Sequence, residues 1–164
     1  MTTTLELHSP AFKYGHPIPA VYTRCDGEDL SPPLEWTGVP PNTKSLELIV
    51  DDPDAPDPKR PKMTWVHWVL YNLPPTETRL EDSMNSTNLP KGTMVGLNDW
   101  KQKGYGGPSP PIGKHRYFFK LFALDTILTD LGPNAKKEDV LEAMKGHVLD
   151  EAILMGTYQK AETS

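Results

Sequence analysis

Residues 64–72 read Thr-Trp-Val-His-Trp-Val-Leu-Tyr-Asn and are almost entirely β-branched or aromatic. Such side chains fit a pleated, half-buried surface, so this segment is predicted to be a β-strand. Pro74 and Pro75 follow shortly afterwards and are expected to end it. Strict alternation divides the side chains of the strand between two faces, with Trp65, His67, Val69 and Tyr71 on one face and Val66, Trp68 and Leu70 on the other.

Further strands are predicted on both sides of this segment. Residues 45–50 (Ser-Leu-Glu-Leu-Ile-Val), 115–124 (His-Arg-Tyr-Phe-Phe-Lys-Leu-Phe-Ala-Leu) and 151–158 are the candidates. Residues 51–56 (Asp-Asp-Pro-Asp-Ala-Pro) are expected to leave the sheet, because the proline at position 53 has no N–H to donate to a ladder. About 5–6% of X–Pro bonds in folded proteins are cis. The chain's 18 prolines therefore predict about one such bond, which we expect at Asp52–Pro53.

One helix is predicted near the end of the chain. From Lys136 onward, Val140, Leu141, Met144 and Val148 recur with helical spacing. This pattern predicts an amphipathic helix near residues 137–147.

Proline content narrows the fold class. Proline accounts for 18 of the 164 residues, roughly twice the usual frequency of about 5%. A proline in a helix interior costs about 3 kcal/mol, which argues against a helix bundle. Residues 98–114 contain four glycines and three prolines and are predicted to form a long loop, of a kind that is commonly functional or disordered. Many strands, one helix and proline-rich loops favour a β-sandwich or barrel with a C-terminal helix.

Charge and composition argue against several classes of protein. The net charge is −5, whereas a sequence-independent nucleic-acid binder or a polybasic membrane-surface protein needs an excess of Lys and Arg. No apolar run approaches the length of a transmembrane segment. The lone Cys25 excludes an internal disulfide framework and a thiolate metal cluster. The length favours a single domain over residues 1–164, and the start of the chain lacks a signal-peptide pattern, which predicts a cytoplasmic protein.

Three junctions between loops and strands carry unusual polar residues: the acidic run at 51–56, His67 within its apolar strand, and His115 at the start of another strand. Each also has a purely structural interpretation, as a turn, a core histidine and a strand cap. A calcium loop starting at Asp52 is a poor match, because Asp57 occupies the position that requires glycine and Met63 the position that requires glutamate.

Together, these residues are chemically suited to a small anion. Two imidazoles can donate hydrogen bonds to an anion, and glycine-rich loops can add backbone N–H groups. Asp52 would repel a dianion unless its carboxylate holds an imidazole in one tautomer or shares a proton with the ligand. The chain has no nucleophile elbow, P-loop or His-Glu-x-x-His motif. The residues alone therefore indicate a small anion pocket.

Five motifs, in order and spacing, resemble the phosphatidylethanolamine-binding protein family, and most closely its bacterial and archaeal branch, described as kinase-inhibitor-like. They span about residues 5–158, nearly the whole chain. The motifs are Ser31-Pro32-Pro33-Leu34-Glu35-Trp36, Asp52-Pro53-Asp54-Ala55-Pro56, Trp65-Val66-His67-Trp68, Gly104-Tyr105-Gly106-Gly107-Pro108-Ser109-Pro110-Pro111-x-Gly113 and His115-Arg116-Tyr117.

The resemblance implies an antiparallel β-sandwich with long Pro/Gly-rich loops and a C-terminal helix. It also implies a small cavity that binds phosphate, phosphoryl head groups or small carboxylates. The ligand-binding residues carried over by motif are Asp52, His67, Gly107, Pro110, Pro111, His115 and Tyr117, with Asp54, Trp65 and Tyr105 at the rim. A homodimer is expected on the same ground, without a cofactor or a resident metal.

Two classes of function stay open. In the first, the protein binds a small phosphorylated or carboxylate ligand and regulates a kinase or another partner protein. In the second, it is a hydrolase or isomerase that uses His67 and His115 as acid and base, with Asp52 orienting one of them. A zinc ion on these same three residues is a weaker variant of the second class.

Overall fold

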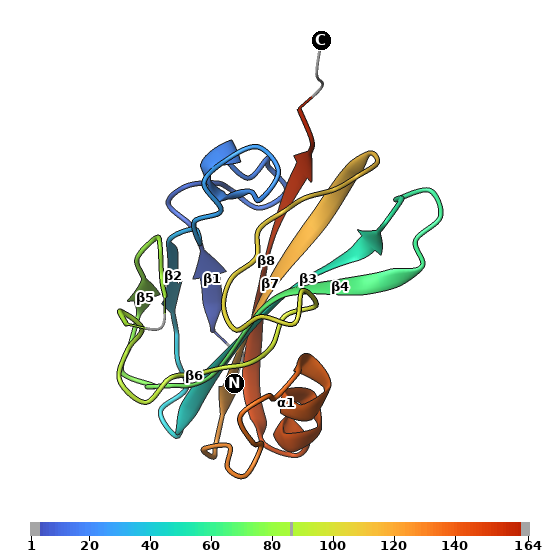
Figure 1. Cartoon of the computed structure of the whole chain (residues 1–164). Helices are drawn as coiled ribbons and strands as arrows, with labels where there is room; N and C mark the ends of the chain where they lie inside the picture. Colours follow the sequence, from blue (N-terminus) through green and yellow to red (C-terminus); the bar gives the residue numbers. More distant parts are fainter. Residues whose placement is uncertain (1–3, 86, 162–164) are drawn as a thin grey trace.

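Two antiparallel sheets face each other in the computed structural model, which describes residues 4–85 and 87–161 (Figure 1). The larger sheet has the strand order β6-β4-β3-β7-β8, with bounds Met94–Val95, Met63–Leu73, Ser45–Ala55, Lys114–Leu124 and Val148–Gln159. The smaller sheet has the order β1-β2-β5, with bounds Glu6–His8, Leu34–Thr37 and Arg79–Leu80. A single turn of 3-10 helix (Ala20–Tyr22) and one α-helix, α1 (Lys137–Met144), complete the fold. The predicted antiparallel β-sandwich with a C-terminal helix is confirmed.

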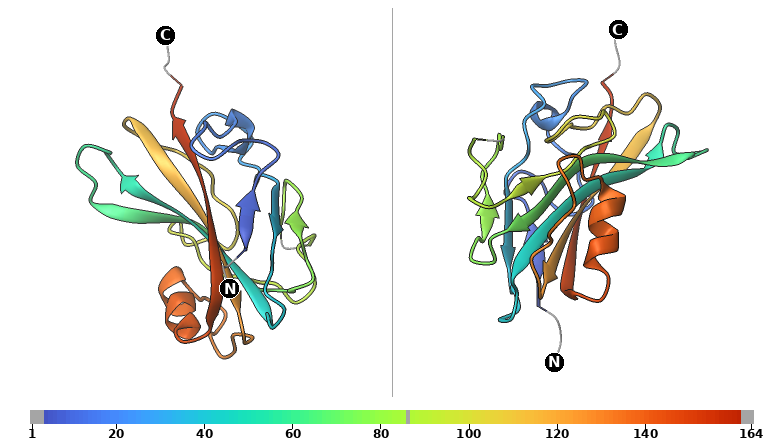
Figure 2. Two further views of the ribbon diagram at one scale, coloured as in Figure 1. Left: turned by 180° about the vertical axis from the view of Figure 1, so that it is seen from behind. Right: turned by 60° about the horizontal axis from the view of Figure 1, so that its bottom comes forward.

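The larger sheet is covered on both faces. Its inner face packs against the smaller sheet, and its outer face carries α1 (Figure 2). The inner core includes Leu34, Trp36, Leu46, Leu48, Val50, Trp68, Leu70, Phe119 and Leu121, and the outer core includes Ile49, Val66, Val69, Tyr71, Phe122, Leu124, Val140 and Met144. A strand buried on both faces needs apolar side chains at nearly every position, which explains the dense apolar runs in the sequence.

Strand β3 is longer than the sequence predicts. It continues through the acidic run to Ala55, so the expectation that residues 51–56 leave the sheet was wrong. The pairing of β3 with β4 is irregular between Asp52 and Ala55. Pro53 is tolerated there because this position does not need a backbone N–H for the ladder. Among the described residues, the cis peptide bond is Ala55–Pro56, so a cis bond is present as expected, but its expected place at Asp52–Pro53 was wrong.

A β-bulge interrupts the alternation of β4. Val50 of β3 pairs with Trp68 and Asp51 pairs with Val66, so His67 is an extra residue without a partner on β3. Beyond the bulge the phase changes: Trp68 faces the inner core, whereas Val69 faces the outer core. The prediction that Val69 shares a face with His67 was therefore wrong.

Helix α1 begins where the sequence predicts but ends early, at Met144. Lys145 has extended backbone angles and Gly146 has a φ of 82°, a left-handed conformation that favours glycine and ends helices. Val148, expected on the helix, is the first residue of β8. Within the described part of the chain, no helix has the length and apolar character needed to cross a bilayer.

Glu47 is a fully buried carboxyl group in the middle of the larger sheet. Its Oε2 accepts hydrogen bonds from Ser45 Oγ (2.9 Å) and from the Asn72 N–H (3.1 Å). Its Oε1 has no partner among the described residues. Burial raises the pKa of Glu47 to about 7 because a buried carboxylate loses its hydration.

This pKa makes stability depend on pH. The folded chain binds more protons than the unfolded chain between the ordinary pKa of 4.5 and about 7. Glu47 therefore makes its full contribution to the free energy of unfolding below pH 4.5. That free energy falls by about 3 kcal/mol as the pH rises through this window. Urea unfolding at pH 5 and pH 8 should show a smaller loss for Glu47→Gln than for wild type. Glu151→Gln, at an exposed position of β8, should behave as wild type, and identical losses in all three proteins would contradict the prediction.

Candidate functional site

A cavity of about 300 Å³, the small cavity, opens where β3, β4 and β7 meet the loop before β7. Each strand contributes inward-facing polar or aromatic groups. Its lining consists of Asp52, Ala55, Pro56, Met63, Trp65, His67, Trp100, Ser109, Pro110, Pro111, His115 and Tyr117. The predicted residues Asp52, Trp65, His67, Pro110, Pro111, His115 and Tyr117 thus lie together, although they come from three strands and a loop.

A second cavity, of about 770 Å³, is larger but chemically plainer. It lies beside β6, and its lining includes Asp29, Lys91 and Lys103 but no histidine. The small cavity brings together two histidines and a buried carboxylate, and it is therefore the candidate site.

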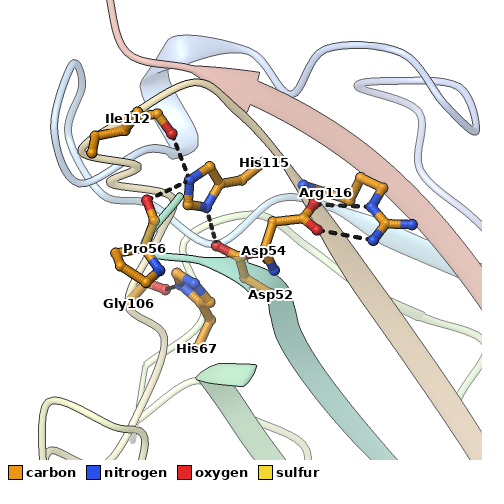
Figure 3. Close-up of polar contacts among 8 residues, drawn as sticks. All are labelled: Asp52, Asp54, Pro56, His67, Gly106, Ile112, His115 and Arg116. Carbon is orange, nitrogen blue, oxygen red and sulfur yellow. Dashed lines mark hydrogen bonds and ion pairs between the residues drawn. The ribbon is translucent and has the colours of Figure 1, made fainter. Parts of the chain in front are cut away.

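Asp52 and His115 form a buried pair in the wall of the small cavity (Figure 3). His115 Nδ1 lies 2.6 Å from Asp52 Oδ2. His115 Nε2 lies 2.9 Å from the carbonyl oxygen of Ile112 and 3.1 Å from that of Pro56. Carbonyl oxygens only accept hydrogen bonds, so Nε2 carries a proton and donates it. Both ring nitrogens are therefore engaged, Nε2 by two carbonyl oxygens and Nδ1 by the Asp52 carboxyl group.

A second acidic residue fixes the position of this pair. The Asp54 N–H donates to Asp52 Oδ1 at 2.7 Å, which closes a tight turn over Pro53. The Asp54 carboxylate accepts two hydrogen bonds from the Arg116 guanidinium, both at 2.9 Å, and one from the Arg116 N–H. The hydrogen bond from Arg116 lowers the pKa of Asp54, whereas burial raises the pKa of Asp52. Asp54, predicted at the rim, is not part of the cavity lining and instead connects β3 to β7.

His67 has a different role from His115. Its Nδ1 lies 2.7 Å from the carbonyl oxygen of Gly106, so Nδ1 donates its proton there and the proton-free nitrogen of the neutral ring is Nε2. Burial lowers the pKa of His67 to about 4, so the ring is neutral at pH 7. The ring packs edge-on against Trp100 and Tyr117, with distances between ring centres of 5.2 and 5.1 Å, and these contacts hold it in place.

Two hydrogen-bond donors in the cavity wall have no acceptor. Trp65 Nε1 and the Tyr117 hydroxyl are buried, and neither has a partner among the described residues. Burial raises the pKa of Tyr117 far above its ordinary value, so the hydroxyl keeps its proton. Buried polar groups are normally satisfied, and an exception requires an explanation such as a bound ligand or water.

Two amides of the glycine-rich loop, those of Gly106 and Gly107, are engaged away from the small cavity. The Gly106 N–H donates to the carbonyl oxygen of His67 (2.9 Å), and the Gly107 N–H donates to Asp29 Oδ1 (2.6 Å). A Cβ at Gly107 would lie 2.3 Å from the carbonyl oxygen of Tyr22, so this glycine is required by close packing. Tyr105 donates its hydroxyl to the same carbonyl oxygen (2.6 Å) and lines the larger cavity. Gly107 and Tyr105, both predicted at the site, lie outside the small cavity.

Sequence reasoning missed five residues that line the small cavity: Ala55, Pro56, Met63, Trp100 and Ser109. Trp100 packs edge-on against Trp65 at 5.5 Å, and the guanidinium of Arg24 lies 4.6 Å from its ring centre. Trp100 could have been suspected from the sequence, because it is a large aromatic residue within a polar, glycine-rich loop.

The described residues contain no group of three or more His, Cys, Asp or Glu side chains arranged to hold a metal ion. In the present arrangement His115 could not coordinate zinc, because Nδ1 faces Asp52 and Nε2 faces two carbonyl oxygens. In the same arrangement, both ring nitrogens of His115 already have hydrogen-bond partners within the protein.

Comparison with known proteins gives one consistent result. The family model described as phosphatidylethanolamine-binding protein matches residues 8–159. The UPF0098 protein of Methanothermobacter thermautotrophicus is 54% identical over 157 residues, which cover 95% of this chain and 99% of that protein. The UPF0098 protein of Chlamydia trachomatis is 45% identical over 95% of this chain and 99% of its own length.

Solved structures agree with the sequence relatives. A putative phosphatidylethanolamine-binding protein homolog from Chlamydia trachomatis superimposes with a TM-score of 0.87 at 44% identity, over 98% of this chain and 100% of that one. YbcL of E. coli, a member of the mammalian PEBP family, gives a TM-score of 0.84 at 32% identity, over 94% of this chain and 98% of that one.

The buried pair can be tested against an exposed pair of the same chemistry. Asp52→Asn removes the carboxyl group that pairs with the buried His115 ring and should reduce the free energy of unfolding by about 3–5 kcal/mol at pH 7. His147 and Asp125 form a similar contact at 2.8 Å, but both side chains are nearly half exposed. Asp125→Asn should therefore cost at most about 1 kcal/mol. Equal losses in urea unfolding would contradict the proposed ion pair.

Proposed function

The chain belongs to the phosphatidylethanolamine-binding protein family, and we propose that it binds a small anionic or phosphorylated ligand in the small cavity. The observation that carries this proposal is the pair of buried donors without acceptors, Trp65 Nε1–H and Tyr117 O–H. An indole N–H only donates, and the Tyr117 hydroxyl keeps its proton, so the partner that completes them must bring acceptor oxygens. Phosphate and carboxylate groups meet this requirement.

The size and charge of the small cavity favour a compact ligand. A volume of about 300 Å³ corresponds to roughly ten water molecules at about 30 Å³ each. That is enough for inorganic phosphate, a phosphoryl head group or a small carboxylate. One proton lies between His115 Nδ1 and Asp52 Oδ2, so this pair has no net charge and the wall favours a monoanion over a dianion.

His67 determines the proton balance of binding. When the His67 ring is neutral, its Nε2 can only accept a hydrogen bond. The oxygens of a fully ionised ligand can also only accept. A hydrogen bond between Nε2 and the ligand therefore needs one added proton. It comes either with the ligand as a P–O–H group or with His67 as an imidazolium, whose pKa the bound anion raises. Both routes couple binding to proton uptake.

A basic rim supports a larger phosphorylated partner. The turn between β3 and β4 contains Lys59, Arg60 and Lys62, and Lys114 lies at the start of β7; all four are exposed. The cavity lining at Pro56 directly precedes this turn. In a chain of net charge −5, such a local excess of cations favours a phosphorylated segment of another protein as the regulated partner. A cytoplasmic location stays a prediction.

The alternative, catalysis with His67 and His115 as acid and base, is less well supported by the geometry. Of these two histidines, His115 has both ring nitrogens engaged within the protein, whereas His67 has only Nδ1 engaged. Release of p-nitrophenol from p-nitrophenyl phosphate by the purified protein, lost in His67→Ala, would favour this alternative.

Calorimetric titration with inorganic phosphate and with phosphoethanolamine tests the binding proposal. Removing one donor, in Tyr117→Phe or Trp65→Phe, should weaken binding by about ten- to hundredfold, because hydrogen bonds to charged groups contribute about 1.5–3 kcal/mol. Tyr14→Phe, at a position 58% exposed, is the matched control and should bind as wild type. Absence of binding at millimolar ligand, or equal affinity in all four proteins, would overturn the proposal.

The pH dependence of phosphoethanolamine affinity tests the proton balance. The free protein has a His67 pKa of about 4, and a phosphomonoester loses its second proton near pH 6. Above both values each bound phosphoethanolamine must take up one proton, so affinity should fall about tenfold between pH 7 and pH 8. His67→Ala should flatten this dependence, and a wild-type affinity that rises with pH would contradict the proposed proton.

We also expect a homodimer. Ile112, 55% exposed beside the mouth of the small cavity, offers apolar surface for a second copy. Sedimentation at tens of micromolar should give twice the chain mass of 18.3 kDa. Ile112→Lys should shift the protein toward monomer, whereas Ile127→Lys, at a position 57% exposed in another loop, should not. A monomeric wild type would end this expectation.

A further inference from the structure

The second cavity, called the large cavity from here on, has a volume of about 770 Å³ and takes no part in the anion site. Its walls are largely apolar. The lining includes Trp68 and Tyr105, which contact each other edge-on with their ring centres 5.4 Å apart. It also includes Met84, Leu89 and Val95. Ligand cavities of about 300–1,000 Å³ typically have such an apolar lining and a few fixed polar groups.

Three charged residues line the large cavity: two exposed lysines and one aspartate. Lys91 and Lys103 line it, although the chain as a whole has a net charge of −5. The carboxylate in its lining, Asp29, is already engaged, because Oδ1 accepts the Gly107 N–H at 2.6 Å and Oδ2 lies 3.7 Å from Arg24. The two lysines are therefore not neutralised by the wall that they share.

A buried hydroxyl adds a third donor. Thr93 lines the large cavity between Lys91 and β6, and its Oγ1 is buried without a hydrogen-bond partner among the described residues. A hydroxyl in this state requires an explanation, as the donors of the small cavity do.

We propose that the large cavity is a second binding site, which takes an anionic amphiphile: a molecule with an apolar body and one anionic head, such as a medium-chain fatty acid. The apolar body contacts Trp68, Tyr105 and Leu89. The head accepts hydrogen bonds from Lys91, Lys103 and Thr93. The size of the cavity, more than twice that of the small cavity, suits a chain rather than a bare phosphate.

The two sites are separate but adjacent in the chain. Because of the bulge in β4, His67 lines the small cavity and Trp68 lines the large cavity. The four tryptophans of the chain therefore distinguish the sites by NMR. A ligand in the large cavity should shift the indole signal of Trp68, whereas phosphate should shift those of Trp65 and Trp100.

The test is a titration of ¹⁵N-labelled protein with decanoate below its micelle concentration, in the presence of saturating phosphate. Decanoate should shift the Trp68 indole signal and bind with one-to-one stoichiometry. Decanol, which has the same apolar chain without the charge, should bind at least about tenfold more weakly, because hydrogen bonds between charged groups are about twice as strong as neutral ones. No shift of Trp68 up to millimolar decanoate, or equal binding of decanol, would overturn the proposal.

Variants locate the head group. Lys91→Glu/Lys103→Glu should weaken decanoate binding at least about tenfold, since it replaces attraction with repulsion. Thr93→Val, which conserves shape, should weaken it by about two- to tenfold. Lys13→Glu/Lys44→Glu reverses two exposed lysines outside the cavity and should bind decanoate as wild type. Indole signals at wild-type positions before decanoate is added will show that both cavity variants are folded. If these folded variants bind decanoate as wild type does, the proposed site is wrong.

Discussion

The buried pair of Asp52 and His115 is the interaction on which the candidate site depends. Two charged groups removed from water remain stable only if their other hydrogen-bonding atoms are also satisfied. Here the Asp54 N–H completes Asp52, and the carbonyl oxygens of Pro56 and Ile112 complete His115. One ion pair thereby holds β3, β7 and the two segments that border the small cavity. Because His115 is fully engaged, the proposed ligand would contact His67, Trp65 and Tyr117 instead.

The acidic run in β3 is compatible with a buried strand because neighbouring residues point to opposite faces. Asp52 faces the inner side and pairs with His115, whereas Asp51 faces the outer side. There its carboxylate contacts Lys137 at the start of α1 (2.8 Å) and Lys120 of β7 (3.3 Å). Each carboxylate has its own cations, so two consecutive charges fit into one strand without facing each other.

The bulge in β4 divides the inner face of the larger sheet between two cavities. A regular strand would send His67 and Trp68 to opposite faces. With one extra residue both face inward, His67 to the small cavity and Trp68 to the large one. The backbone of Gly106 completes the arrangement, since its N–H and carbonyl both bond to His67 while the adjacent Tyr105 packs on Trp68.

The sequence by itself determined the strands at 64–72 and 115–124, the start of the helix and most residues of the small cavity. Dense β-branched and aromatic runs have few alternatives to a buried strand, and the polar residues within them stand out. Only the tertiary structure decided the extension of β3 through Pro53, the change of phase after His67 and the direction of the His115 nitrogens. These features depend on the register between strands that are distant in sequence, and a shift of one residue reverses which face a side chain occupies. The large cavity was also decided only by the tertiary structure. Its lining comes from segments between Asp29 and Pro133 that are brought together only in the folded chain.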